Sequence, residues 1–213
     1  MNRVRAAGFT LIELLIVVGI IGLLAAAFLP DLLAGKETAN IEADKANMRQ
    51  FAQWLEMSKS RNRGLPTEGG HGFLLTLWTK ELIDHSPANF DRFFTPGIRE
   101  EDNQWKALRP QVERNEKIWT SLADTTTEDT NYAARAKEHL KGMTAYTEAW
   151  MANDNEGVWA FKSGVVNILW GDGSVRDLQW NDMKDRFNLV DKTEPFKTWG
   201  PDSPYDALQK LAN

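Results

Sequence analysis

The residue types that most often carry catalysis are few and scattered in this sequence. Its three histidines, His71, His85 and His139, are far apart, and no metalloprotease helix motif, nucleophile elbow or phosphate-binding loop accompanies them. Ser174 follows Asp172 closely, but both lie in a short glycine-containing turn, where these residue types are common. We therefore expect no enzymatic activity and no obligatory cofactor.

Calcium is the metal for which the sequence offers candidate ligands. Asp154, Asn155 and Glu156 are adjacent in the chain, and Asp172 lies in the turn just described. Carboxylate and amide oxygens are the ligands that Ca²⁺ takes in proteins. Acidic residues exposed to solvent in loops are the simpler interpretation of this pattern, so we expect no metal site. If the chain did bind calcium, these four residues would be the candidate ligands.

Composition excludes several other function classes. The chain has 213 residues, 25 of them Lys or Arg and 30 Asp or Glu, which gives a formal net charge of −5. Such a surface repels a phosphate backbone, so we expect no nucleic-acid partner. The absence of cysteine excludes disulfides and thiolate chemistry. Mean hydropathy is −0.45 although residues 14–29 carry no polar side chain, so the apolar residues are concentrated in one block.

One carboxylate, Glu13, lies in this apolar N-terminal block. Residues 9–29 would extend roughly 31 Å as a helix at about 1.5 Å per residue, which is enough to cross a hydrocarbon core. Arg3 and Arg5 precede the block and predict that the N-terminus stays cytoplasmic and the rest of the chain lies outside. A charge within a spanning helix costs on the order of 3 kcal/mol at mid-membrane, so Glu13 has no use in a plain anchor.

Three interpretations of the block are open: an uncleaved anchor, a secretory signal cleaved near residues 25–27, or a leader cleaved after Gly8. The sequence GFTLIE at residues 8–13, followed by LLIVV, resembles the prepilin cleavage and methylation motif of type IV pilins and type II secretion pseudopilins. This resemblance implies that prepilin peptidase cuts between Gly8 and Phe9 and methylates the new amino terminus. It also implies that Glu13 and Pro30 are the family's glutamate and helix-bending proline.

The resemblance implies a structural subunit of a type IV pilus or a type II secretion pseudopilus. Its partners would be prepilin peptidase, other copies of itself or related pilin-like subunits, and the inner-membrane assembly machinery. The subunit would span the inner membrane once, with its head outside, before it enters the filament. There the Phe9 ammonium of one subunit can pair with Glu13 of a neighbour. At about 4 Å such a pair gains on the order of 4 kcal/mol before desolvation, which would set the register.

The remaining sequence predicts an α+β, pilin-like fold. We expect a long N-terminal helix, half in the membrane and half amphipathic, packed on a small antiparallel β-sheet head. Ile41, Met48, Phe51 and Leu55 recur at helical spacing and form the apolar stripe of the amphipathic half, which ends before Gly64. The expected divisions are a leader at 1–8, a transmembrane and assembly helix at 9–30, the amphipathic half at 31–63 and the head at 64–213.

Within the head, a β-hairpin is expected from two apolar runs, 165–170 and 175–180, around a glycine turn. We also expect a helix over 72–84, helical turns interrupted at Pro110, a polar loop over 124–131 and a short helix over 205–211. Residues 164–175 resemble the end of a group of pilin-like proteins that carry a histidine, nine residues and Asp-Gly. Lys162 stands in place of that histidine, so its role in the group does not carry over.

Nine tryptophans support a second hypothesis, a minor pilin that acts as a surface adhesin. Exposed indole rings could stack on a polysaccharide. Most of the tryptophans are spaced with other apolar residues, which favours core packing. The candidates for exposure are Trp105, Trp150, Trp159 and Trp199, and three or more of them coplanar on one open face would favour adhesion.

Overall fold

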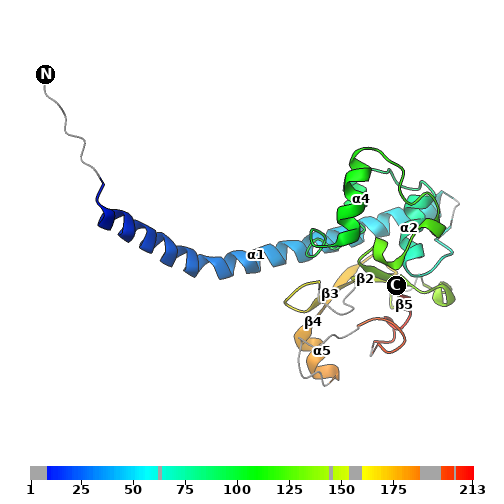
Figure 1. The fold of residues 1–213 in the computed structure, drawn as a ribbon. Helices are drawn as coiled ribbons and strands as arrows, with labels where there is room; N and C mark the ends of the chain where they lie inside the picture. The colour runs from blue at the N-terminus through cyan, green and yellow to red at the C-terminus, as the bar shows by residue number, and fades with distance from the viewer. Residues whose placement is uncertain (1–8, 62–63, 144–145, 154–159, 188–197, 204) are drawn as a thin grey trace. The chain divides into compact units, whose positions relative to one another are not determined.

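The computed structural model describes residues 9–61, 64–143, 146–153, 160–187, 198–203 and 205–213 (Figure 1). The chain divides into two compact units, residues 1–39 and residues 40–213. Helix α1 (Leu11–Ser60) contains the boundary between them. The predicted long N-terminal helix is confirmed as one element, and it continues through Pro30 without a break.

The part of α1 in the second unit has one buried face. Its buried residues are Asp44, Asn47, Met48, Phe51, Ala52, Trp54, Leu55 and Ser58. Met48, Phe51 and Leu55 are completely buried, and Ile41 is partly buried against Phe161, so the predicted apolar stripe is confirmed. At the end of the helix, the Ser58 hydroxyl donates to the Gly64 carbonyl at 2.8 Å.

The sheet is antiparallel throughout. It contains β1 (Tyr132–Arg135), β2 (Ala149–Asn153), β3 (Val165–Trp170), β4 (Val175–Gln179) and β5 (Leu211–Ala212), in the order β4-β3-β2-β1-β5. The hairpin predicted from sequence is β3 and β4, with Leu169 opposite Val175 across the turn. Its return strand ends at Gln179, because Trp180 begins helix α5 (Trp180–Phe187).

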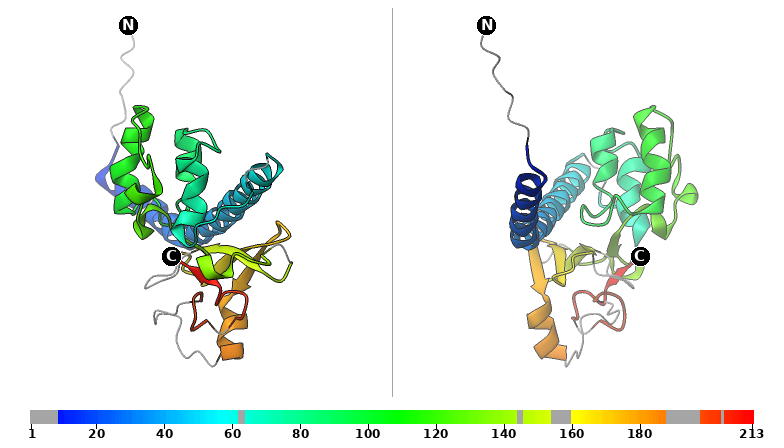
Figure 2. Two further views of the ribbon diagram at one scale, coloured as in Figure 1. Left: turned by 90° about the vertical axis from the view of Figure 1, so that its right-hand side faces the viewer. Right: turned by 60° about the vertical axis from the view of Figure 1, so that its left-hand side comes forward.

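Side chains on the two faces of the sheet belong to two different apolar clusters. Tyr132 and Ala134 of β1 belong to the cluster formed with α1 and α2 (His71–Thr79), while Ala133 between them belongs to the other. That second cluster includes Met183 of α5 and Leu208 of the C-terminal segment. Figure 2 shows α2 and α4 (Asn103–Glu113) on one side of the sheet and α5 with the C-terminal segment on the other.

Two helix predictions need correction. The helix expected over 72–84 ends at Thr79, because Lys80 caps it and Glu81 takes a left-handed backbone conformation with φ 51°. Helix α4 passes through Pro110, where an interruption was expected. Lys106 is exposed, so water can satisfy the carbonyl that Pro110 leaves without an amide donor.

The remaining segments of the head are short. They include α3 (Pro87–Asp91) and three 3₁₀ turns at Leu122–Asp124, Thr127–Asp129 and Lys137–His139. The middle turn lies in the expected polar loop. The short helix expected over 205–211 is wrong. Turns there lead into β5, which pairs Leu211 with Arg135 and Ala212 with Ala134 of β1.

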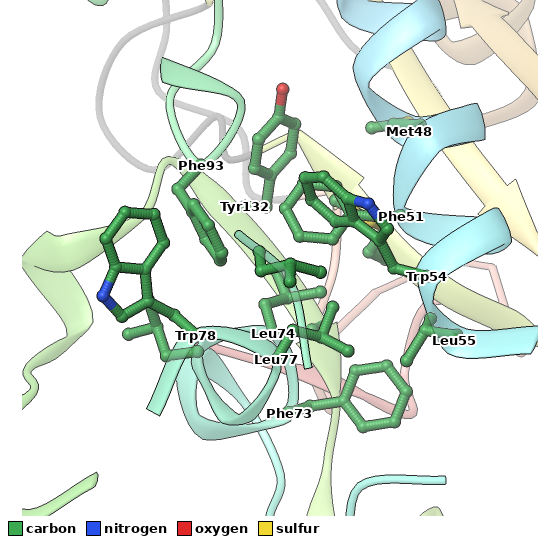
Figure 3. Close-up of a cluster of buried hydrophobic side chains, with 14 of the residues drawn as sticks. Met48, Phe51, Trp54, Leu55, Phe73, Leu74, Leu77, Trp78, Phe93 and Tyr132 are labelled. Carbon is green, nitrogen blue, oxygen red and sulfur yellow. The ribbon is translucent and has the colours of Figure 1, made fainter. Parts of the chain in front are cut away.

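The main core is rich in aromatic rings, which lie between α1, α2 and the sheet (Figure 3). Phe51 contacts Trp54 and Phe93 edge to face, with ring centroids 5.1 Å apart in both pairs. Trp78 of α2 makes similar edge contacts with Phe90 and Phe93. These rings fix the second part of α1 to the head.

Phe51→Ala should lower the free energy of unfolding by about 3 to 5 kcal/mol, because it opens a cavity among rings that cannot collapse into it. Met57→Ala is the matched control, since Met57 lies on the same helix but is 43% exposed, and it should cost no more than about 0.5 kcal/mol. Urea unfolding of the detergent-solubilised chain, followed by tryptophan fluorescence, measures both. Equal losses would contradict this account of the core.

Candidate processing and assembly site

Helix α1 begins with a capping box formed by Thr10 and Glu13. The Thr10 amide and hydroxyl both donate to Glu13 Oε2, at 2.8 and 2.7 Å, and the Glu13 amide donates to Thr10 Oγ1 at 3.2 Å. The first helical hydrogen bond joins the Leu14 amide to the Thr10 carbonyl at 3.2 Å. Reciprocal bonds of this kind fix the first residue of a helix. The Thr-x-x-Glu spacing before an apolar run is a readable signal that our sequence analysis missed.

Two of the predicted site residues lie at the start of α1. Phe9 precedes the cap and is 76% exposed, and Glu13 lies within the first turn of α1. Pro30 lies about 25 Å further along the helix at about 1.5 Å per residue, so it does not share a site with them. Gly8 lies outside the described residues.

Beyond Glu13, the side chains of α1 up to Leu33 are exposed and, apart from Asp31, apolar. Among the described residues, α1 is the one helix that is long and apolar enough to cross a membrane, by length and composition, and no residue of its most apolar stretch is buried in the protein. A helix satisfies its backbone groups internally, which suits such a segment to lipid.

The tryptophans do not form an exposed platform in the described part of the chain. Trp150 and Trp199 are buried and Trp105 is partly buried, so their predicted exposure is wrong, and Trp159 lies outside the described residues. The Trp150 indole donates to the Met143 carbonyl at 2.5 Å, and the Trp105 indole donates to Asp91 Oδ1 at 2.9 Å. Both rings therefore serve packing.

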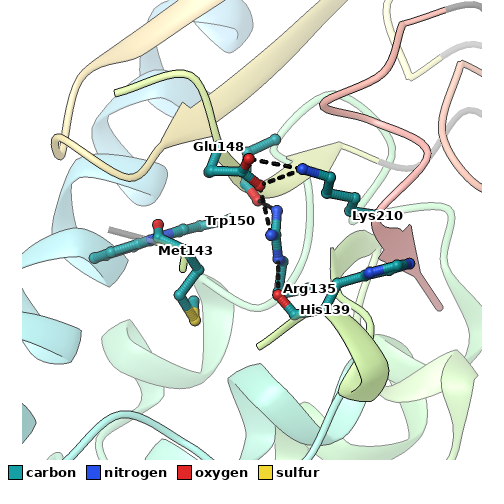
Figure 4. Close-up of polar contacts among 7 residues, drawn as sticks. Arg135, His139, Met143, Glu148, Trp150 and Lys210 are labelled. Atoms are coloured by element: carbon teal, nitrogen blue, oxygen red, sulfur yellow. Dashed lines mark hydrogen bonds and ion pairs between the residues drawn. The ribbon is translucent and has the colours of Figure 1, made fainter. Parts of the chain in front are cut away.

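Next to Trp150, a buried arginine joins three segments of the head (Figure 4). Arg135 donates from Nη2 to Glu148 Oε2 at 2.5 Å and from Nε to the His139 carbonyl at 2.7 Å. Lys210 Nζ contacts Glu148 Oε1 at 2.7 Å, which ties the C-terminal segment to the sheet. Burial acts to raise the pKa of Glu148, but the hydrogen bonds from Lys210 and Arg135 outweigh it and lower the pKa.

Both carboxylate oxygens of Asp172, the one calcium candidate among the described residues, accept hydrogen bonds within the β3–β4 hairpin. Its Oδ1 accepts bonds from the Ser174 amide and hydroxyl at 2.9 and 2.6 Å, and Arg176 donates to Oδ2 at 2.9 Å. The other three candidates, residues 154–156, lie outside the described part of the chain. Within the described part, no three or more His, Cys, Asp or Glu side chains gather in a way that could hold a metal ion. Lys162, which replaces the histidine of the related group, is exposed before β3.

The N-terminal residues match a known family. Residues 3–29 match the family model of the prokaryotic N-terminal methylation motif. The chain is 36% identical over 93 residues to type II secretion system core protein G of Pseudomonas aeruginosa, which covers 43% of this chain and 63% of that protein. It is 46% identical over 85 residues to the type IV wide pilus major component PilA4 of Thermus thermophilus, covering 40% of this chain and 60% of that protein.

A second type II secretion system core protein G, from Pectobacterium carotovorum, is 34% identical over 87 residues, 40% of this chain and 54% of that protein. The chain thus spans less than two thirds of the length of these curated relatives. No solved structure gives a significant match. The family motif and the relatives confirm the resemblance to pilins and pseudopilins that the first 30 residues suggested.

Glu148→Ala should lower the free energy of unfolding by about 3 to 5 kcal/mol, because it leaves the buried Arg135 guanidinium without its carboxylate. Glu68→Ala is the control. Glu68 pairs with Lys137 at 2.8 Å, but the two side chains are 42% and 67% exposed, so the loss should stay below about 1 kcal/mol. Chemical unfolding of the two variants measures the difference, and similar losses would show that Arg135 does not depend on Glu148.

Proposed function

We propose that this pilin-like chain is a structural subunit of a type IV pilus or a type II secretion pseudopilus, held in the membrane and assembled through the first part of α1. The observation that carries the proposal is one carboxylate, Glu13, placed one turn from Phe9 at the start of a helix that is otherwise apolar up to residue 30. The relatives carry names of secretion-system and pilus components, which agrees with a subunit that has no catalytic role.

Processing by prepilin peptidase would cut between Gly8 and Phe9 and methylate the Phe9 amine. The capping box supports this, because it keeps Phe9 outside the helix and exposed. Residues 1–8 are then the leader, 9–30 the transmembrane and assembly segment, 31–63 the amphipathic half of the helix and 64–213 the head. The N-terminus would face the cytoplasm and the head would lie outside the inner membrane.

Assembly would use the charge on Glu13. Within its own chain the carboxylate receives hydrogen bonds only from the neutral Thr10 amide and hydroxyl, among the described residues, so its charge has no counter-ion there. A neighbouring subunit would supply one as the Phe9 ammonium. The partners are accordingly copies of this chain or related pilin-like subunits, together with the inner-membrane assembly machinery. The adhesin alternative loses its support, since no described tryptophan is fully exposed.

The mature protein should begin at Phe9 and carry a methylated amine. Mass spectrometry of the N-terminal peptide from membrane or filament fractions tests this directly. A mature start near residue 28 would identify a conventional secretory signal and would remove the basis for a filament subunit.

Glu13→Leu should abolish assembly while membrane insertion and cleavage after Gly8 continue, because the neighbour's Phe9 ammonium is left without a buried partner, at a cost of about 3 to 5 kcal/mol. In a simple anchor, the same change would remove an unfavourable charge and leave retention intact. The measurement is the ratio of sheared filament, or crosslinked pseudopilus, to membrane-bound mature subunit.

Glu13→Gln separates the two interactions of this side chain. Glutamine can keep the capping box with Thr10 but carries no charge. Assembly should fail with this variant as it does with leucine. Filaments formed at the normal level by Glu13→Gln would show that the cap, and not the charge, is what assembly requires.

A further inference from the structure

A second carboxylate of α1, Asp44, is buried where the helix first enters the core of the head. It is the first fully buried residue along α1, with 0% exposure. The Tyr132 hydroxyl of β1 donates to Asp44 Oδ1 at 2.5 Å, and Asn167 Nδ2 of β3 donates to Oδ2 at 2.7 Å. Both partners are also completely buried. One carboxyl group therefore joins the helix to two strands of the sheet.

No cation among the described residues forms an ion pair with Asp44. Its sequence neighbour Lys45 pairs instead with Glu42 of α1 and Asp177 of β4, at 3.0 Å to each. Arg92, which follows α3, donates to the side-chain oxygen of Asn47 at 3.0 Å. A buried carboxylate that receives only neutral hydrogen bonds is costly, and the cost falls when the group takes up a proton. Burial accordingly raises the pKa of Asp44 to about 6, against the smaller opposing effects of the Tyr132 and Asn167 bonds and of Lys45.

The site can accommodate the neutral acid as well as the carboxylate. Asn167 Nδ2 faces Asp44, while Asn167 Oδ1 is buried and has no hydrogen-bond partner among the described residues. Turning this amide end for end would present its oxygen to the proton of a neutral Asp44, in exchange for the longer bond of 3.3 Å that Nδ2 donates to the Ile41 carbonyl. Tyr132 can donate to Asp44 in either state, because burial and the nearby Asp44 carboxylate raise the Tyr132 pKa well above its ordinary value.

We propose that Asp44 is a proton-operated latch that holds the beginning of the second unit's helix, residues 40–48, on the sheet. With the proton bound, the acid is neutral and the helix is held firmly. When the proton passes to solvent, an unpaired negative charge remains in the interface and loosens this contact, just beyond the boundary of the two units at residues 39 and 40. The latch goes beyond the proposed function and does not depend on whether the chain assembles.

The direction of the pH effect follows from the two pKa values of the carboxyl group. An aspartate in the unfolded chain titrates near 3.9, whereas Asp44 in the folded chain titrates at about 6. The folded form therefore binds more protons between these values. The stabilising effect of the proton is complete below about pH 4 and is lost as pH rises through about 6. From this group alone, the folding equilibrium constant should be about tenfold larger at pH 5 than at pH 7.5.

The test is hydrogen–deuterium exchange of the full chain in detergent, at pH 5 and pH 7.5, corrected for intrinsic exchange and read on peptides covering residues 40–50. Protection of this segment in the wild type should be about tenfold greater at pH 5. Asp44→Asn should remove that difference, because its amide carries no ionisable proton. Glu42→Gln is the matched control, since Glu42 lies on the same helix but is exposed, and it should keep the difference. An unchanged difference in Asp44→Asn would overturn the proposal.

A second variant keeps the test decisive if Asp44→Asn fails to fold. Tyr132→Phe retains the buried ring but removes a hydrogen bond that lowers the pKa of Asp44. The midpoint of the protection change should then move to higher pH than in the wild type. A midpoint that stays in place would show that Asp44 is not the titrating group.

Discussion

The structure depends on one continuous helix that meets two different surroundings. An α-helix satisfies its own backbone groups, so α1 can pass from a segment with apolar side chains on all sides to a segment packed on protein without changing its backbone. Only the side chains change. Up to Leu33 they are exposed and, apart from Glu13 and Asp31, apolar, and from Asp44 onward a single stripe is buried. The head is the set of elements that covers this stripe, with Phe51 at its centre.

Helix α5 and the C-terminal segment pack on the face of the sheet opposite α1. The second cluster there is small, and it is completed by residues at the end of the chain such as Trp199 and Leu208. Lys210 pairs with Glu148 beside the buried Arg135, and the two residues of β5 extend the sheet beyond β1. This polar network adds to the apolar contacts of Trp199, Leu208 and Leu211 in holding the C-terminal segment. The Glu148 carboxylate and the carbonyls of His139 and Ala149 accept hydrogen bonds from Arg135, which explains how the end of β1 accommodates a buried guanidinium.

The parts of the fold that could be predicted from sequence are those written in local patterns. The long helix, its stripe through Met48 and Phe51, and the β3–β4 hairpin all have short-range periodicity. The Asp44 network joins residues 88 and 123 positions apart, and the Lys210–Glu148 pair joins residues 62 apart, so no local pattern announces them. Strand β5 exists only through its pairing with β1, and the local sequence favoured a helix there.

The prediction that Trp150 and Trp199 are exposed failed for a related reason. Trp150 lies beside an irregularity in the pairing of β2 with β3, where the alternation of inward and outward side chains is broken. Trp199 follows no periodic segment at all. Glu13 could be identified as a site residue from sequence, because it is a charged residue next to a long apolar run. Thr10 was equally readable from the capping-box spacing.

The two carboxylates of α1 show how position on one helix decides the chemistry of an acid. Glu13 lies in the first turn, where free amides and the helix dipole stabilise negative charge, and Thr10 adds an amide and a hydroxyl donor. An acid in that place is suited to act as a charge toward a partner's cation. Asp44 lies more than thirty residues along the same helix, beyond any benefit from the dipole, and it receives bonds from neutral groups alone. An acid in that place is suited to act as a neutral hydrogen-bonding group. The helix can therefore carry both residues because each is solvated by a different set of protein groups.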